Sequence, residues 1–185
     1  MEIRYLNDMK EVLYDQEWLK TAPNLKLYYM NRGVKEKNGL RYDITVIPPR
    51  MLGKEFIKTK GNRNSNNFLE FYTVLQGEAL FLMQKMKGKS VKDVFAIKAK
   101  KGSWVIEPPG YAIITINSRR KTLKLGNWIS PKNKNIYKEI EIMKGACYYY
   151  TTSGWIKNKN YKKFPKLRFE KPLKTVPKNL DFLNR

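Results

Sequence analysis

Short β-rich runs recur along this chain at nearly regular spacing, and each is ended by a turn rich in glycine, proline or asparagine. Arg41–Ile47 illustrates the pattern, because polar and apolar residues alternate along it and Pro48-Pro49 follows. Such alternation is typical of a strand with one buried face, and proline ends it because it cannot donate to the sheet ladder. About ten such runs, with no long helical period and no repeat, predict a β-sandwich or β-barrel.

The expected strands lie at Leu25–Asn31, Leu40–Ile47, Glu55–Lys60, Leu69–Leu75, Glu78–Met86, Asp93–Lys100, Ser103–Glu107, Tyr111–Asn117, Thr122–Ile129, Ile136–Met143 and Ala146–Thr152. The opening segment Leu6–Lys20 instead predicts short helical turns, with Asn7 or Asp8 as one cap and Asp15 starting a second turn. We therefore expect a mainly all-β barrel domain over residues 1–154. A basic, proline-containing C-terminal arm is expected over residues 155–185.

Composition restricts the chemistry that this barrel can carry. The 185 residues include 38 Lys and Arg against 16 Asp and Glu, a net charge of +22, with one cysteine and no histidine. The absence of histidine excludes histidine metal ligands, histidine acid–base catalysis and Ser-His or Cys-His nucleophile systems. A single Cys147 excludes an internal disulfide and a cysteine-based zinc site. Its apolar, aromatic neighbours predict a buried structural thiol.

The sequence predicts no association with a membrane. Residues 1–20 are dense in charge and lack the apolar core of a signal peptide. The longest uncharged run, Gly145–Ile156, is shorter than the roughly 20 apolar residues of a spanning helix. We therefore expect a cytoplasmic protein.

Two segments resemble the two halves of the cupin signature. Glu70–Leu82 is a strand, a glycine turn and a second strand, and Lys101–Ala112 is a glycine turn, a strand and a Pro-Pro corner. Further motifs are similar in order and spacing to the archaeal, cupin-type glucose-6-phosphate isomerases over roughly residues 1–145, namely Leu6–Met9, Asp15–Lys20, Gly53–Phe56, Thr59–Gly61 and Pro108-Pro109. The resemblance implies a double-stranded β-helix barrel, or jelly roll. Cupins often pair through edge strands, so it also allows a homodimer.

The metal ligands of that family do not carry over to this chain. In the family, Thr-Lys-Gly precedes a His-x-His pair and a Glu, and a last His follows the Pro-Pro corner. The four ligands hold a divalent metal that helps move a proton between C1 and C2 of a sugar phosphate. Here the matching positions are Asn62, Asn64, Glu70 and Ile113. Amide oxygens suit only hard cations in sites with more carboxylates, so we expect no metal and no other cofactor.

The residual pocket comprises Thr59, Lys60, Gly61, Glu70 and Tyr72. Glu70 is either a surviving general base or a carboxylate paired with a lysine or arginine. Thr59-Lys60-Gly61 either cradles a phosphate, as the resemblance implies, or is a strand end with a turn glycine. Tyr72 is expected to line the barrel. Residues 62–67 predict a solvated polar loop, from which Arg63 can also contact phosphate oxygens.

Basic clusters are the remaining functional signal. One hairpin tip carries four lysines, a second turn carries three basic residues, and the C-terminal segment mixes lysines with aromatics and prolines. The expected nucleic-acid contacts are Arg63, Lys85, Lys87, Lys89, Lys92, Arg119, Arg120, Lys121, Lys157, Lys159, Lys162, Lys163, Lys166 and Arg168. Lysine and arginine neutralise phosphates, and aromatic side chains stack on bases.

The first hypothesis is therefore a non-catalytic RNA-binding protein, ribosome-associated or a lineage-specific ribosomal protein that contacts rRNA. Binding of DNA is a further possibility, because the only sequence feature that favours RNA over DNA is the lack of a helix that could read a DNA groove. The alternative is a divergent sugar-phosphate isomerase, with Glu70 as base and Lys60 or Arg63 for the phosphate. A third reading is a metal-free sensor of sugar phosphates or nucleotides.

Overall fold

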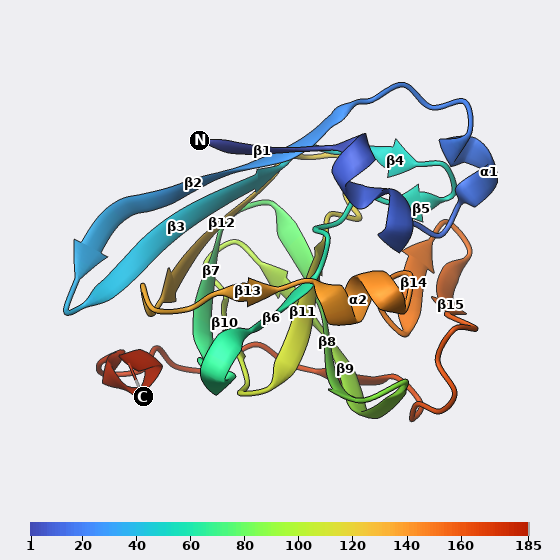
Figure 1. Cartoon of the computed structure of the whole chain (residues 1–185). Helices are drawn as coiled ribbons and strands as arrows, with labels where there is room; N and C mark the ends of the chain where they lie inside the picture. Colours follow the sequence, from blue (N-terminus) through green and yellow to red (C-terminus); the bar gives the residue numbers. More distant parts are fainter. Residues whose placement is uncertain (185) are drawn as a thin grey trace.

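The computed structural model describes residues 1–184, and about half of them form β-sheet (Figure 1). Two six-stranded sheets face each other and form a barrel, and a four-stranded sheet lies at one end of it. The predicted all-β, cupin-type fold with short N-terminal helical turns is confirmed.

The first sheet has all its strands antiparallel. Its order is β1 (Glu2–Tyr5), β2 (Lys26–Lys37), β3 (Leu40–Ile47), β12 (Leu123–Ile129), β7 (Glu70–Gln76) and β10 (Trp104–Glu107). The second sheet runs β13 (Asn135–Ile136), β6 (Asn62–Asn64), β11 (Tyr111–Ile116), β8 (Glu78–Lys87), β9 (Ser90–Lys100) and β16 (Arg168–Glu170). Among the strands within residues 1–184, only β16 pairs in parallel, with β9.

The small sheet consists of β15 (Gly154–Lys157), β14 (Tyr148–Thr151), β5 (Glu55–Phe56) and β4 (Met51–Leu52). The strand predicted over Glu55–Lys60 is therefore shorter in the structure. The side chains of Glu55 and Lys58 face inward, with Lys58 Nζ 2.5 Å from Glu55 and 2.7 Å from the carbonyl oxygen of Val12. Both side chains are almost fully buried.

The N-terminal turns are the 3₁₀ turn η1 (Leu6–Val12) and the helix α1 (Gln16–Leu19). Asp15 caps α1 as predicted, accepting a hydrogen bond of 3.1 Å from the amide of Trp18. The prediction of Asn7 or Asp8 as the first cap is wrong, because η1 already begins at Leu6. Asp8 lies inside η1 and accepts a 2.8 Å hydrogen bond from the amide of Tyr5.

The prediction of a strand over Ile136–Met143 is wrong for most of its length. Only β13 is extended, and the helix α2 (Lys138–Ile142) follows it. The Glu-Ile-Glu-Ile alternation is typical of a strand, yet burial follows a helical spacing of three residues from Ile140 to Met143. Packing of these two side chains into the core decided the conformation.

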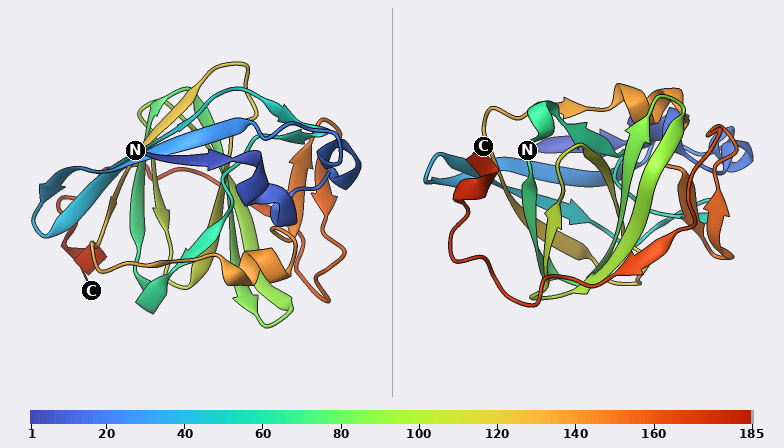
Figure 2. Two further views of the ribbon diagram at one scale, coloured as in Figure 1. Left: turned by 45° about the horizontal axis from the view of Figure 1, so that its top comes forward. Right: turned by 90° about the horizontal axis from the view of Figure 1, so that it is seen from below.

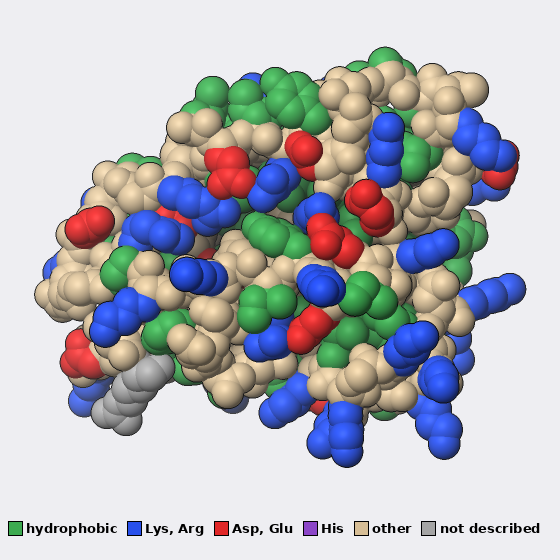
Figure 3. Space-filling model, viewed as in Figure 1, with side chains coloured by type: hydrophobic (Ala, Val, Ile, Leu, Met, Phe, Trp, Pro, Cys, Tyr) green, Lys and Arg blue, Asp and Glu red, His purple; other side chains and the backbone are tan. Residues whose placement is uncertain are grey.

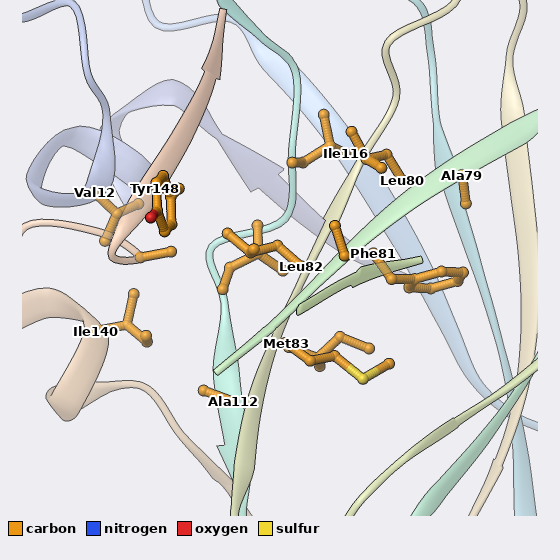
Figure 4. Close-up of a cluster of buried hydrophobic side chains, with 14 of the residues drawn as sticks. Val12, Ala79, Leu80, Phe81, Leu82, Met83, Ala112, Ile116, Ile140 and Tyr148 are labelled. Carbon is orange, nitrogen blue, oxygen red and sulfur yellow. The ribbon is translucent and has the colours of Figure 1, made fainter. Parts of the chain in front are cut away.

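One hydrophobic core fills the barrel and continues beneath the helical turns. Figure 4 shows Leu82 of β8 within a cluster that also includes Val12 of η1, Ile140 of α2 and Tyr148 of β14. Cys147 is buried beside this cluster, and burial raises the pKa of its thiol to about 12. The prediction that this thiol is buried is confirmed.

The C-terminal arm lies along the outside of the barrel (Figure 2). After β16 it crosses β10, where the amide of Leu173 donates to the carbonyl oxygen of Trp104 at 2.9 Å. It ends in the turn η3 (Asp181–Asn184), whose Leu183 is fully buried against Leu40 and Phe71. The predicted division after residue 154 falls within the β14–β15 hairpin. Within residues 1–184, no helix has the length and apolar character that crossing a membrane requires.

Candidate functional site

A polar cavity of about 60 Å³ lies between the two large sheets. The first sheet contributes side chains of β2, β3, β7 and β12, and β11 contributes from the second sheet. Prominent lining residues are Tyr28, Arg32, Asp43, Glu70, Tyr72 and Tyr137. Tyr72 lines the barrel as predicted, with its ring 5.4 Å from that of Phe81.

The structure brings the four positions equivalent to the family's metal ligands together at this cavity. Asn62 lies opposite Ile113 in the β6–β11 ladder, and both line the cavity with Glu70. Asn64 donates to Glu70 at 3.4 Å. The polar loop predicted over residues 62–67 is thus partly wrong, because residues 62–64 form β6 and Asn64 is 1% exposed.

These side chains do not fit a divalent metal. Ile113 has no donor atom, and the amide oxygen of Asn64 already accepts from Asn133 at 2.9 Å. The Glu70 carboxylate accepts hydrogen bonds from the amides of both Asn64 and Asn127. No group of three or more His, Cys, Asp or Glu that could hold a metal occurs in the described part of the chain. Where the family has its metal ligands, this chain has amide side chains that form hydrogen bonds with one another and with the Glu70 carboxylate.

Glu107 is a functional candidate that sequence reasoning missed. It lies opposite Glu70 in the β7–β10 ladder, is fully buried, and has no hydrogen-bond donor for either carboxyl oxygen. Burial first, and the nearby Glu70 carboxylate second, raise the pKa of Glu107 well above its usual range. Burial likewise raises the pKa of Glu70 to about 7. A protonated Glu107 carries no charge, which removes the cost of burying a second carboxylate near Glu70.

The helix α2 closes the corner where a phosphate was expected. Glu141 lies 2.6 Å from the Nζ of Lys60, and Glu139 accepts two hydrogen bonds of 2.9 Å from Arg63. Both cations predicted to bind phosphate are therefore neutralised within the chain. Sequence reasoning missed this because it assigned the glutamates to a strand.

Thr59 and Gly61 have structural roles in the same corner. Thr59 accepts a 2.9 Å hydrogen bond from the amide of Thr115 on β11. Gly61 has a φ of +88°, and a Cβ there would lie 2.8 Å from Ile114. A side chain at Gly61 would therefore strain the backbone and collide with the core.

A second candidate site lies outside the barrel, where the arm pairs with the β8–β9 hairpin. The amide of Val91 donates to the carbonyl oxygen of Lys163 at 2.8 Å, and that of Lys162 donates to Lys89 at 3.0 Å. These bonds join two clusters that are far apart in sequence. We call the resulting surface the basic end; its exposed lysines are Lys85, Lys87, Lys89, Lys92, Lys157, Lys159, Lys162, Lys163 and Lys166.

Lysines dominate the charge at the basic end. In Figure 3 blue side chains gather at the lower right, over the β8–β9 tip and the neighbouring arm. Across residues 1–184, none of its nine lysines forms an ion pair within 4.0 Å. Arg168, at its margin, is instead held by Asp93 and Glu170.

The predicted contacts Arg119, Arg120 and Lys121 lie elsewhere, in the turn between β11 and β12. All three are exposed. Arg119 is bound to Glu78 at 2.6 Å, and Lys98 approaches the same carboxylate at 3.4 Å. This turn is therefore a separate basic surface, and Arg120 and Lys121 are its unpaired members in the described structure.

Two facing antiparallel sheets around a polar cavity define a cupin-type barrel protein. A family model described as glucose-6-phosphate isomerase (GPI) matches residues 6–166, and the chain belongs to that family. It is 31% identical to the glucose-6-phosphate isomerase of Thermococcus litoralis over 125 residues, 64% of each chain. It is 30% identical to that of Pyrococcus furiosus over 121 residues, 62% of each chain. The matches thus span less than two thirds of these relatives.

Solved cupin structures are similar at lower identity. The cupin domain of Schizosaccharomyces pombe Cnp3 is 12% identical with a TM-score of 0.42, over 69% of this chain and 79% of that one. An oxalate oxidase in complex with the substrate analogue glycolate is 11% identical with a TM-score of 0.47, over 60% and 54% of the two chains.

Proposed function

We propose that this family member binds RNA through the basic end and does not use the metal-dependent chemistry of its relatives. Its partner would be rRNA or another structured RNA of the ribosome, which places its action in the cytoplasm. The barrel is then a rigid body that presents the lysines. Contacts of this kind neutralise phosphates and read no base edges.

One observation carries the proposal. Backbone hydrogen bonds between the arm and the β8–β9 hairpin gather nine exposed lysines without a carboxylate partner in residues 1–184. A solvated surface normally intersperses both signs of charge. Holding so many like charges together raises the free energy of the folded chain, and a polyanion relieves that repulsion.

The test compares two variants of equal charge. Lys87→Gln, Lys89→Gln and Lys162→Gln remove charge at the basic end, whereas Lys54→Gln, Lys132→Gln and Lys174→Gln remove it elsewhere. The basic-end variant should bind an rRNA fragment at least tenfold more weakly. The slope of log affinity against log salt concentration should fall by about 2, since each lost phosphate contact removes about 0.7–0.9.

The control variant should stay close to the wild type in both measurements. Sedimentation of a lysate at low and high salt would show whether the protein follows one ribosomal subunit. Salt-insensitive binding, or equal losses in the two variants, would contradict the proposal.

A second candidate function is metal-free binding or isomerisation of a sugar phosphate, the class of substrate that the names of the relatives indicate. It is favoured by the pKa of about 7 for Glu70, which suits a general base in a cavity. The pairing of Lys60 with Glu141 counts against it. Turnover of fructose 6-phosphate in the presence of a chelator, lost in Glu70→Gln, would favour this function over the first.

A further inference from the structure

We infer that a groove beside β15 is a stacking site for the bases of single-stranded RNA. The inference rests on the proposed RNA binding and names the surface that bases, as opposed to phosphates, would contact. We call it the aromatic groove; it is a hollow of about 380 Å³ lined by Phe56, Tyr150, Trp155, Phe169 and Arg119, among others.

The aromatic side chains of the groove form a row. Phe56 stacks on Tyr150 with ring centroids 5.4 Å apart, and Tyr150 lies 4.7 Å from Trp155, its cross-strand partner. Phe169 of β16 completes the wall and is 67% exposed. An exposed phenylalanine gains little from the fold of the chain itself, and its free face is available to a base.

Cations lie directly beside these rings. Arg119 and Lys98 line the groove together with Glu78, the carboxylate with which both are paired. An adjoining hollow shares Phe56 and Arg119 with it, adds Arg50 and Arg120, and has no acidic residue in its lining. Neither Arg50 nor Arg120 has a carboxylate within ion-pair distance in the described structure. Arginine forks match phosphate oxygens, so rings for bases lie next to cations for the backbone.

The groove is also continuous with the basic end. The arm runs beside β9, from Lys163 opposite Ser90 to Glu170 opposite Ile97. The seven residue steps along β9 from Ser90 to Ile97 correspond to about 23 Å. Lys166 and Arg168 lie on the part of the arm that runs beside them. A single strand that follows the arm from the basic end therefore arrives at Phe169.

One exposed ring and three half-buried rings beside arginines favour a single strand over other polyanions. Bases in a duplex are stacked on one another and present no free face, whereas single-stranded nucleic acid offers bases to aromatic platforms and phosphates to cations. RNA, as opposed to DNA, follows from the proposed function.

The experiment uses the full chain and a mixed-sequence RNA of about a dozen nucleotides, with its duplex and its DNA counterpart. Phe169→Leu keeps an apolar side chain but removes the planar ring, and Phe169→Tyr restores it. Phe169→Leu should weaken single-stranded RNA binding about fivefold or more. It should leave duplex binding and the salt slope unchanged, and Phe169→Tyr should bind like the wild type.

A matched control is Val176→Ala, which changes an exposed apolar side chain elsewhere on the arm. Arg120→Gln should weaken binding and also lower the salt slope by about 1. Unchanged affinity in both Phe169→Leu and Arg120→Gln, with the dependence on the basic-end lysines intact, would overturn the groove and leave the proposed function standing. Tighter binding of DNA than of RNA would overturn the assignment to RNA. No dependence on the basic end would overturn the proposed function itself.

Discussion

Glu107 is the residue whose surroundings differ most from those of an ordinary carboxyl group. Burial raises its pKa well above 4.5 and raises that of Glu70 to about 7, so the folded chain holds protons that the unfolded chain has released. The contribution of these two groups to stability therefore falls as pH rises above about 4.5, because at both sites the native state binds more protons than the unfolded state. The two carboxyl groups lower stability at neutral pH.

Glu107→Gln should consequently stabilise the protein at pH 8, because glutamine keeps the shape of the protonated carboxyl group and has no proton to lose. The gain should vanish towards pH 4, where wild-type Glu107 is protonated in both states. Urea unfolding across this pH range measures the effect, with the exposed Glu17→Gln as control. A gain that does not depend on pH would show that the carboxyl pair is not the cause.

Metal binding should be lost at the positions of the family's ligands and should return when histidines are restored there. The wild-type chain should show no heat of binding with Zn²⁺ or Mn²⁺ in calorimetry. Asn62→His, Asn64→His and Ile113→His together should bind one ion, because all three positions surround Glu70 and imidazole suits these metals. Stoichiometric metal binding by the wild type would refute the conclusion that these side chains do not fit a divalent metal.

Among the elements, α2 shows that the periodicity of apolar residues cannot by itself distinguish a short helix from a strand. Four residues of alternating glutamate and isoleucine, 139–142, match a strand locally, and only the positions of Lys60, Arg63 and the core select the helix. Glu139 and Glu141 then project to the two cations. The strands, in contrast, mostly follow their sequence pattern, and β3 has the predicted bounds of Leu40 and Ile47.

The C-terminal turn η3 should contribute to the stability of the folded chain. Leu183 is fully buried on the outer face of the first sheet. Leu183→Ala should therefore cost about 2 kcal/mol of unfolding free energy, near the low end for a buried leucine because the cluster lies near the surface. Val176→Ala, at an exposed position, should cost less than about 0.5 kcal/mol. Equal denaturation midpoints for Leu183→Ala and the wild type would mean that the turn does not add to stability.

For the whole molecule, the net charge of +22 predicts two opposite effects of salt. Screening reduces repulsion among the lysines, so the unfolding temperature should rise from low to moderate ionic strength. RNA affinity should fall over the same range. The variant with three basic-end lysines replaced should show a smaller rise in calorimetry. An unfolding temperature that falls with added salt would contradict this account of the charge.

The sequence by itself determined most of the long strands, the glycine turns, the positions that have lost their metal ligands and the excess of positive charge. These follow from local alternation, from motif spacing and from composition, which need no knowledge of distant contacts. Only the tertiary structure placed Glu107 against Glu70, folded α2 over Lys60 and Arg63, and joined the arm to the β8–β9 hairpin. Each of these depends on which strands become neighbours, and pairing between remote segments is fixed by the packing of the whole barrel.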